Sequence, residues 1–230
     1  MPFKCMKKIK PQRKTNVIFA TVAALVFVCF LSGCFGEEAV WGVAAGEIKD
    51  LPAVAASSWR IDSRSLRVDL IELDSSPYEM ASALSKGKVD VAYIDAKKAI
   101  AAMARGELDV YVVAVTYREN SGKPERLLVA GRKWIEKCPE GAGLVLALHR
   151  KAIRALRENR AEAVKLVDMW VKPRPVETGN ALDTAKWESG LYVEDLVGVV
   201  EDLRSAGAIT AEQADAVALE FLQKTPGNRK

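Results

Sequence analysis

The sequence predicts an α/β protein: a mostly parallel sheet of four to five strands with flanking helices, followed by an α-helical C-terminal half. Short apolar or alternating segments in the first half are separated by helical patterns of about ten residues and by short turns, an order typical of βαβ units. Half of the 230 residues are hydrophobic and 28% are charged, so the chain can bury a core.

The predicted strands are the most β-rich segments, and each is bounded by turn or capping residues. Asp95 is placed to cap the helix after the third strand, and Ser76-Pro77-Tyr78-Glu79 has the form of a capping box with proline at the first helical position. We expect strands over 40–44, 67–73, 89–94 and 108–117, with 127–130 as a fifth candidate, and helices over 51–59, 77–86 and 96–105.

From residue 139 onward the apolar residues recur at helical spacing. Asn159 with Glu162, and Thr210 with Gln213, have the spacing of helix-capping pairs. The stretch 172–190 contains Pro173, Pro175 and Gly179 and is predicted to be a loop. The expected helices cover 139–159, 161–171, 193–206 and 210–223.

The first 33 residues have the pattern of a secretory signal. Six basic residues precede every acidic one, and 17–30 is an apolar run of fourteen residues, shorter than the roughly twenty that a membrane span needs. The run ends in Leu31-Ser32-Gly33-Cys34, which resembles the lipobox of prokaryotic lipoproteins. We predict a signal peptide over 1–33, a lipid on Cys34, a tether over 34–39, one domain over 40–223 and a tail over 224–230; an uncleaved anchor is the alternative.

Composition excludes several functions for the mature chain. Without the leader, 28 basic residues face 30 acidic ones, so no positive excess supports nucleic-acid binding. Cys5 and Cys29 leave with the leader and Cys34 takes the lipid, so Cys138 is expected to form no intramolecular disulfide. His149, the single histidine, is expected to be solvated or half-buried, and it cannot build a metal cluster. No catalytic motif is present, which predicts a protein without enzyme activity or cofactor.

Five segments carry a resemblance to a known family. The residues concerned are 83–92 (ALSKGKVDVA), 101–106 with the strand after it, 134–140 (WIEKCPE), 147–163 and 187–207. Together they resemble extracytoplasmic solute-binding proteins of ABC importers with the type II periplasmic-binding fold, in the aliphatic-sulfonate, taurine, nitrate and thiamine-precursor branch. Members of that family trap a ligand between two lobes. Here only nine residues, 118–126, separate Tyr117 from Leu127, so the resemblance implies a single lobe.

The resemblance implies a ligand site at the carboxyl ends of the strands. The candidate residues there are Ala45, Gly46, Ser75, Ser76, Tyr78, Asp95, Thr116 and Tyr117. Each has a structural alternative, as a helix cap or a packed edge residue.

The function implied is a solute-binding protein for a small organic anion or a nitrogen or sulfur compound. It would be lipid-anchored on the outer side of the cytoplasmic membrane, or in the outer membrane if the envelope has one, and its partners would be the ABC permease subunits. The alternative is a one-lobed derivative that acts as a membrane-surface interaction or sensor module. A homodimer that pairs two half-sites is a further hypothesis.

Overall fold

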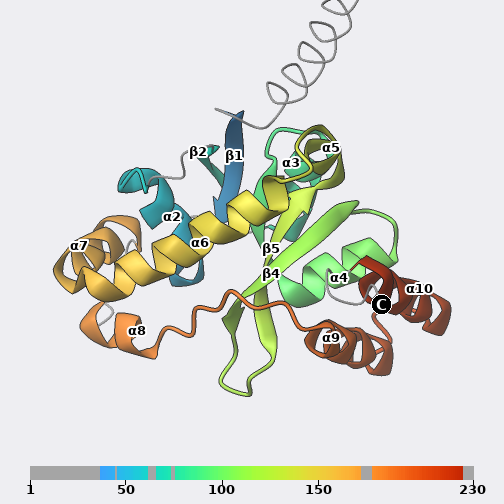
Figure 1. The fold of residues 1–230 in the computed structure, drawn as a ribbon. Coiled ribbons are helices and arrows are strands. Elements are labelled where there is room, and N and C mark those ends of the chain that lie inside the picture. Colours follow the sequence, from blue (N-terminus) through green and yellow to red (C-terminus); the bar gives the residue numbers. More distant parts are fainter. Residues whose placement is uncertain (1–36, 45, 62–65, 74–75, 172–177, 225–230) are drawn as a thin grey trace, which may run out of the picture.

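A computed structural model describes residues 37–44, 46–61, 66–73, 76–171 and 178–224. Its center is a five-stranded sheet in the order β2-β1-β3-β5-β4 (Figure 1). Strands β1 to β4 run in one direction and β5 runs against them, which confirms the predicted α/β class with a mostly parallel sheet. The strands are β1 Glu37–Ala44, β2 Leu66–Leu73, β3 Val91–Asp95, β4 Val110–Arg118 and β5 Pro124–Gly131.

The fifth strand is longer than predicted and has a defined place. Residues 119–123 are the only link between β4 and β5, so β5 must return beside β4 as an antiparallel hairpin. Gly122, with φ of +86°, closes the turn. The other edge of β5 pairs with β3, and of the nine residues 118–126 that separate Tyr117 from Leu127, 118 and 124–126 belong to strands β4 and β5.

Helices cover both faces of the sheet. Figure 1 shows α2, α6 and α7 on one side and α4, α9 and α10 on the other. Because side chains alternate along a strand, Val91 and Tyr93 join the first core, whereas Ala92 and Ile94 join the second. The helices are η1 Ile48–Asp50, α2 Leu51–Ser58, α3 Pro77–Ser85, α4 Ala96–Ala104, α5 Arg132–Lys137, α6 Gly141–Glu158, α7 Arg160–Trp170, α8 Thr178–Thr184, α9 Val193–Ser205 and α10 Ala211–Lys224.

Of the four predicted helix caps, two form and two do not. Asp95 caps α4 by accepting from the Lys98 backbone N–H at 2.9 Å, and Thr210 and Gln213 form the reciprocal box before α10. Ser76 occupies the N-cap position of α3, but its hydroxyl makes no capping bond. Asn159 also makes none, because its side-chain amide donates to the Ala155 carbonyl at the end of α6.

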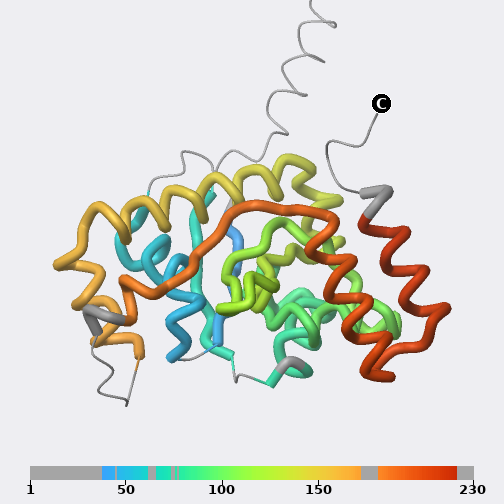
Figure 2. The backbone as a smooth tube through the Cα atoms, turned by 90° about the horizontal axis from the view of Figure 1, so that it is seen from below, coloured from blue at the N-terminus to red at the C-terminus, as the bar shows by residue number. Residues whose placement is uncertain are grey.

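The predicted loop over 172–190 was partly wrong, because α8 lies within it. After α8 the chain crosses the molecule to α9 (Figure 2). On the way it pairs with the outer edge of β4: the Val115 N–H donates to the Gly190 carbonyl at 2.8 Å, and the Glu188 N–H donates to the Thr116 carbonyl at 2.9 Å. This crossing segment covers a sheet edge that would otherwise be open.

The two ends of the chain bear on the predicted domain limits. The proposed signal peptide and Cys34 lie outside the described residues, and so do 225–230 of the proposed tail. Strand β1 begins at Glu37, so it takes up part of the predicted tether. Among the described residues no helix has the length and hydrophobicity to cross a membrane.

Cys138 corrects one expectation. It is fully buried and disulfide-bonded, whereas the sequence argument left it unpaired. The other three cysteines fall within 1–36, outside the described residues. The expectation of an unpaired Cys138 required that all three be removed or lipidated before they can pair with it.

Candidate functional site at the strand ends

A cavity of about 240 Å³ opens at the carboxyl ends of β1 and β3. This is the edge of the sheet at which the sequence resemblance implies a ligand site. Helices α3 and α4 and the segment between β1 and α2 contribute to its wall. We call it the strand-end cavity. Its lining residues are Ala44, Glu47, Lys49, Ser76, Met80, Tyr93, Ile94, Asp95, Lys98 and Arg126.

The structure brings two of the predicted residues, Ser76 and Asp95, into this cavity. Tyr78 lies outside it with 75% of its surface exposed. Thr116 is fully buried, and Tyr117 does not line the cavity, although its ring lies 6.0 Å from the Lys49 ammonium. Both residues lie on β4, which is separated from β1 and β3 by β5, so they do not reach the cavity at the ends of those strands.

Of the other three predicted positions, only Gly46 lies within the described residues, and it does not line the cavity. Gly46 adopts a φ of +74° in the turn after β1, a conformation that favours glycine. Ala45 and Ser75 lie outside the described residues.

Arg126 and Asp50 form the most buried charged pair near the cavity, and the sequence argument missed both. The Asp50 carboxylate is fully buried; it accepts from the Arg126 Nε at 3.0 Å and from the Ala44 N–H at 2.8 Å. Burial raises the pKa of Asp50 from 3.8 to about 6, against the opposing effect of Arg126. Asp50 thus ties the end of β1 to β5.

The Arg126 side chain is only 13% exposed and lines the cavity. Its Nε is used by Asp50, while Nη2 lies 3.9 Å from a Glu47 carboxylate oxygen, beyond hydrogen-bond length. Within the described residues no hydrogen bond uses its Nη donors. The Nη groups of a guanidinium held in this way are suited to an acceptor such as a carboxylate or sulfonate, in competition with Glu47.

Two tryptophans hold the segment that carries Glu47 and Lys49. The Trp170 indole N–H donates to the Glu47 carbonyl, and the Trp187 indole N–H donates to the Ile48 carbonyl, each at 3.2 Å. Both come from the C-terminal half, more than 120 positions away in the chain. The cavity wall is therefore positioned by distant parts of the sequence.

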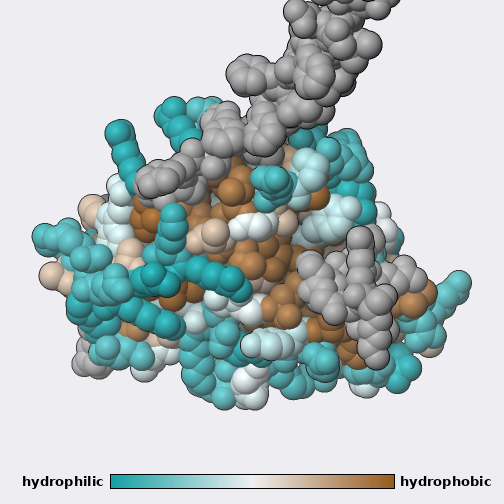
Figure 3. Space-filling view, in the orientation of Figure 1, coloured by the Kyte–Doolittle hydropathy of each residue, from teal (hydrophilic) through white to brown (hydrophobic). Residues whose placement is uncertain are grey.

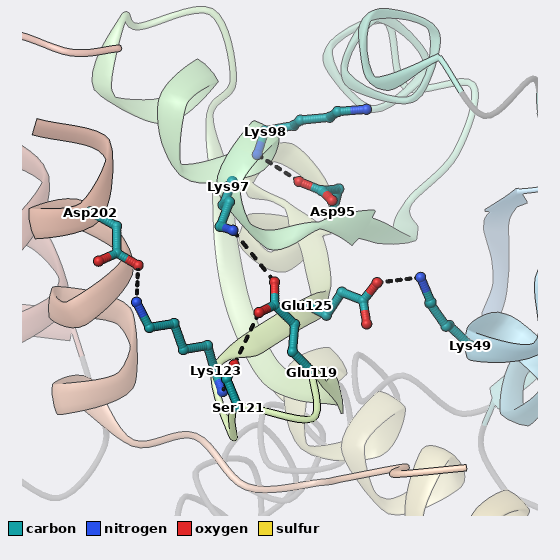
Figure 4. Close-up of polar contacts among 9 residues, drawn as sticks. All are labelled: Lys49, Asp95, Lys97, Lys98, Glu119, Ser121, Lys123, Glu125 and Asp202. Carbon is teal, nitrogen blue, oxygen red and sulfur yellow. Dashed lines mark hydrogen bonds and ion pairs between the residues drawn. The ribbon is translucent and has the colours of Figure 1, made fainter. Parts of the chain in front are cut away.

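The remaining charges of the cavity differ in how they are paired. Lys49 is ion-paired with Glu125, and the Asp95 carboxylate is used in the cap of α4. The Lys98 side chain extends away from these contacts, and its ammonium has no partner among the described residues (Figure 4). The Ser76 hydroxyl is also uncommitted. Arg126, Lys98 and Ser76 are thus the groups available to a ligand.

Tyr93 lines the cavity, and its hydroxyl contacts the buried His149. The Tyr93 hydroxyl and His149 Nδ1 are 2.7 Å apart, and His149 Nε2 is 2.6 Å from the Glu188 carbonyl oxygen. Because a carbonyl only accepts, Nε2 carries the proton and the tyrosine donates to Nδ1. Burial lowers the pKa of His149 from 6.5 to about 4, so it is neutral at pH 7. His149 is therefore a buried structural residue, and the expectation of a solvated or half-buried side chain was wrong.

Among the described residues, no group of three or more His, Cys, Asp or Glu side chains is placed to hold a metal ion.

Comparisons with known proteins bear on the fold. No protein-family model and no curated protein matches the chain. A conserved Candida albicans gene product, described as showing the generic periplasmic binding protein fold, is similar with a TM-score of 0.68 and 10% identity, over 81% of this chain and 95% of that one. The chain has the periplasmic-binding-protein fold. The described residues form one lobe of it, with a single sheet.

Two alkanesulfonate-binding proteins share this fold. The protein from Xanthomonas axonopodis pv. citri, solved with MOPS bound, gives a TM-score of 0.60 at 10% identity, over 79% of this chain and 97% of that one. The aliphatic sulphonate-binding protein of Escherichia coli gives 0.61 at 13% identity, over 79% and 91%. Both names state what those two proteins bind, an alkanesulfonate and an aliphatic sulphonate.

Proposed function

We propose that this chain is a lipid-anchored, extracytoplasmic solute-binding protein that captures a small organic anion for an ABC importer. The observation that carries the proposal is the Arg126 guanidinium, which lines the strand-end cavity and whose Nε is held by buried Asp50. A preorganised guanidinium loses little entropy when it binds a planar oxyanion.

The remaining chemistry of the cavity supports the same ligand class. Lys98 adds a second cation, and the Ser76 hydroxyl at the start of α3 adds a donor. Glu47 and Asp95 also line the cavity, and they favour a ligand whose negative charge is confined to one end. At about 240 Å³, the cavity suits a small head group.

Binding can be tested by calorimetry on the full chain in lipid nanodiscs, with empty nanodiscs as the blank. We expect saturable, one-to-one, micromolar binding of at least one member of a panel of alkanesulfonates, nitrate, amino acids and pyrimidines. Arg126→Gln should weaken that binding by about a hundredfold, because it removes a charge-assisted pair.

The matched control for this variant is Arg67→Gln, which removes an exposed arginine from the edge strand β2. It should bind as the wild type does. No binding with any member of the panel, or equal losses in the two variants, would refute capture at this site.

The lipid anchor rests on Leu31-Ser32-Gly33-Cys34 and on the apolar run before it. Mass spectrometry of the amino-terminal peptide should find Cys34 as the first residue, carrying a diacylglyceryl group. A Cys34 joined to Cys138 through a disulfide, or an intact leader on a protein found in the cytosol, would refute the anchor.

The single lobe favours a second candidate, a membrane-surface interaction module that no longer transports. The β4–β5 hairpin stands where a longer insertion would be needed to build a second lobe. Two ion pairs, Lys97–Glu119 and Lys123–Asp202, join the tip of this hairpin to α4 and α9 (Figure 4). The strand-end cavity then has one wall, which a second copy could complete. Sedimentation should show a ligand-promoted dimer if two half-sites pair, and a monomer at all concentrations would exclude that pairing.

A further inference from the structure

A second and larger hollow lies between α3 and α4, next to the strand-end cavity. Its volume is about 560 Å³, within the range of roughly 300–1,000 Å³ that is usual for small-molecule sites. We call it the α3–α4 groove. Its lining residues are Tyr78, Ala81, Ser82, Ser85, Lys97, Lys98, Ala101, Ala102, Arg105, Glu107 and Leu203.

Helical spacing explains why the hollow exists. Tyr78, Ala81, Ser82 and Ser85 share one face of α3, and 97–105 supplies the facing positions of α4. The facing side chains are mostly alanine and serine, too short to fill the space between the helices. The floor is apolar, because Ala101, Ala102 and Leu203 are core residues that keep 7–8% of their surface exposed.

The rim carries a positive charge. Lys97, Lys98 and Arg105 line the groove together with a single acid, Glu107. Arg105 is paired with Glu107 at 2.8 Å, and Lys97 is 3.4 Å from Glu119, but the Lys98 ammonium has no partner in the described part of the chain. The mature chain as a whole would be slightly acidic, so this concentration of basic groups is local.

Tyr78 supplies an aromatic surface at the same place. It is the most exposed of the large hydrophobic side chains in the described residues, at 75%. Exposed aromatic rings at the edge of an apolar hollow are suited to cover a flat apolar ligand.

From these features we propose that the α3–α4 groove binds an amphipathic organic anion, with an aryl or short alkyl body on the alanine floor and its acidic group at Lys98. The size of the groove favours a small molecule over a protein. Positions 78 to 85 span only about 10 Å along a helix, whereas a stable protein partner needs roughly 800 Å² on each side. The site does not depend on the function proposed for the strand-end cavity.

Three probes separate the parts of the proposed ligand: naphthalene-2-sulfonate has the body and the charge, 2-naphthol has the body alone at pH 7, and methanesulfonate has the charge alone. Each is titrated against the full chain in nanodiscs, with empty nanodiscs as the blank. We expect naphthalene-2-sulfonate to bind at least about tenfold more tightly than either of the other two.

Variants locate the binding. Ser82→Leu places a larger side chain in the groove from α3, and it should weaken naphthalene-2-sulfonate binding at least about tenfold. Ala161→Leu, an exposed position on α7, is the matched control and should leave binding unchanged. Arg126→Gln should also leave it unchanged, because Arg126 lines only the strand-end cavity of the two hollows.

Three results would overturn the proposal: no binding of naphthalene-2-sulfonate, equal binding by the Ser82→Leu variant, or loss of binding in the Arg126→Gln variant. The last would place the probe in the strand-end cavity. If the panel for that cavity fails while the groove result holds, only the function proposed for the cavity falls. Thermal unfolding of each variant confirms that it is folded.

Discussion

The two hollows lie side by side and share Lys98, but their walls are built differently. The strand-end cavity is bounded by charged groups that hydrogen bonds hold in place, notably Arg126, which Asp50 holds, and the segment tied by two tryptophans. The groove is bounded by small side chains on two helices and by a lysine without a partner. The comparison teaches that a fixed constellation of charges depends on distant contacts, whereas a hollow with an apolar floor needs only short residues at helical spacing.

The largest effect is expected from removing Asp50, which holds Arg126 in the wall of the strand-end cavity. Asp50→Ala leaves the Arg126 guanidinium and the Ala44 N–H buried without their partner. We expect the free energy of unfolding to fall by about 3–5 kcal/mol at pH 7.5 in urea denaturation. Asp69→Ala is the control: this carboxylate is 51% exposed, and its loss should cost less than about 1 kcal/mol. Equal costs would show that Asp50 does not hold the cavity together.

The pH dependence of stability tests the buried titration of Asp50 against that of His149. Asp50 has a folded-state pKa of about 6 against 3.8, so between these values the native state binds more protons and stability falls as pH rises. His149 has a pKa of about 4 against 6.5, so over the same window the unfolded state binds more protons and stability rises with pH. The two effects oppose each other in the wild type.

Asp50→Asn should therefore expose the His149 effect. Between pH 4.5 and 6, the stability of this variant should rise by about 1.4 kcal/mol per pH unit more than that of the wild type. Urea midpoints measured across the pH series give the two slopes, and Asp69→Asn serves as the control. Parallel curves for Asp50→Asn and the wild type would contradict the buried titration of Asp50.

A smaller effect should follow from one of the tryptophan contacts. Trp187→Phe keeps an aromatic ring but removes the N–H that donates to the Ile48 carbonyl. We expect a loss of about 1 kcal/mol in unfolding free energy, together with weaker ligand binding in the strand-end cavity. Trp59→Phe is the control, because the Trp59 indole makes no such bond among the described residues. If Trp187→Phe is fully stable and binds as the wild type does, the loop is held by other contacts.

The smallest effect is expected at the groove. Ser82→Leu changes a half-buried wall residue that faces open space, so its stability should stay within about 0.5 kcal/mol of the wild type. Thermal unfolding measures this directly. A loss as large as that of Asp50→Ala would mean that the groove is a tightly packed seam and not an open hollow.

Much of the fold could be predicted from local patterns. The alternation of β2, the Asp95 cap and the Thr210–Gln213 box are short-range signals, and each agrees with the structure. Helix α8 was missed because prolines and glycines dominate the segment around it. The Ser76 box failed because the Ser76 carbonyl accepts from the Glu79 and Met80 N–H groups while its hydroxyl makes no capping bond.

The position of the cavity could be predicted from the sequence, but most of the residues that line it could not. The rule for open α/β sheets located the strand ends, and there it found Ser76 and Asp95. Arg126 and Lys49 were missed because they look like ordinary surface charges in sequence. Arg126 could have been suspected once β5 was assigned, since it directly precedes the buried run 127–130 on that strand.

The distribution of hydrophobic residues on the surface also depends on the tertiary structure. In the face shown in Figure 3, hydrophobic residues gather over the middle and hydrophilic ones lie around them. In Figure 1 the middle of the same view is occupied by α6 and by strands β4 and β5. The periodicity of α6 predicts an apolar stripe, but which strand it faces follows from the topology of the sheet.

The sequence by itself determined the α/β class, the parallel βαβ units and the single lobe, because these follow from periodicity, turn residues and the short link between Tyr117 and Leu127. Only the tertiary structure decided which charges meet at the strand ends. Trp170, Trp187 and Arg126 lie 76 to 139 positions from the groups they bind, and no local pattern encodes such contacts. They form because burying a carboxylate or a carbonyl is favourable only when a donor from elsewhere in the fold arrives with it.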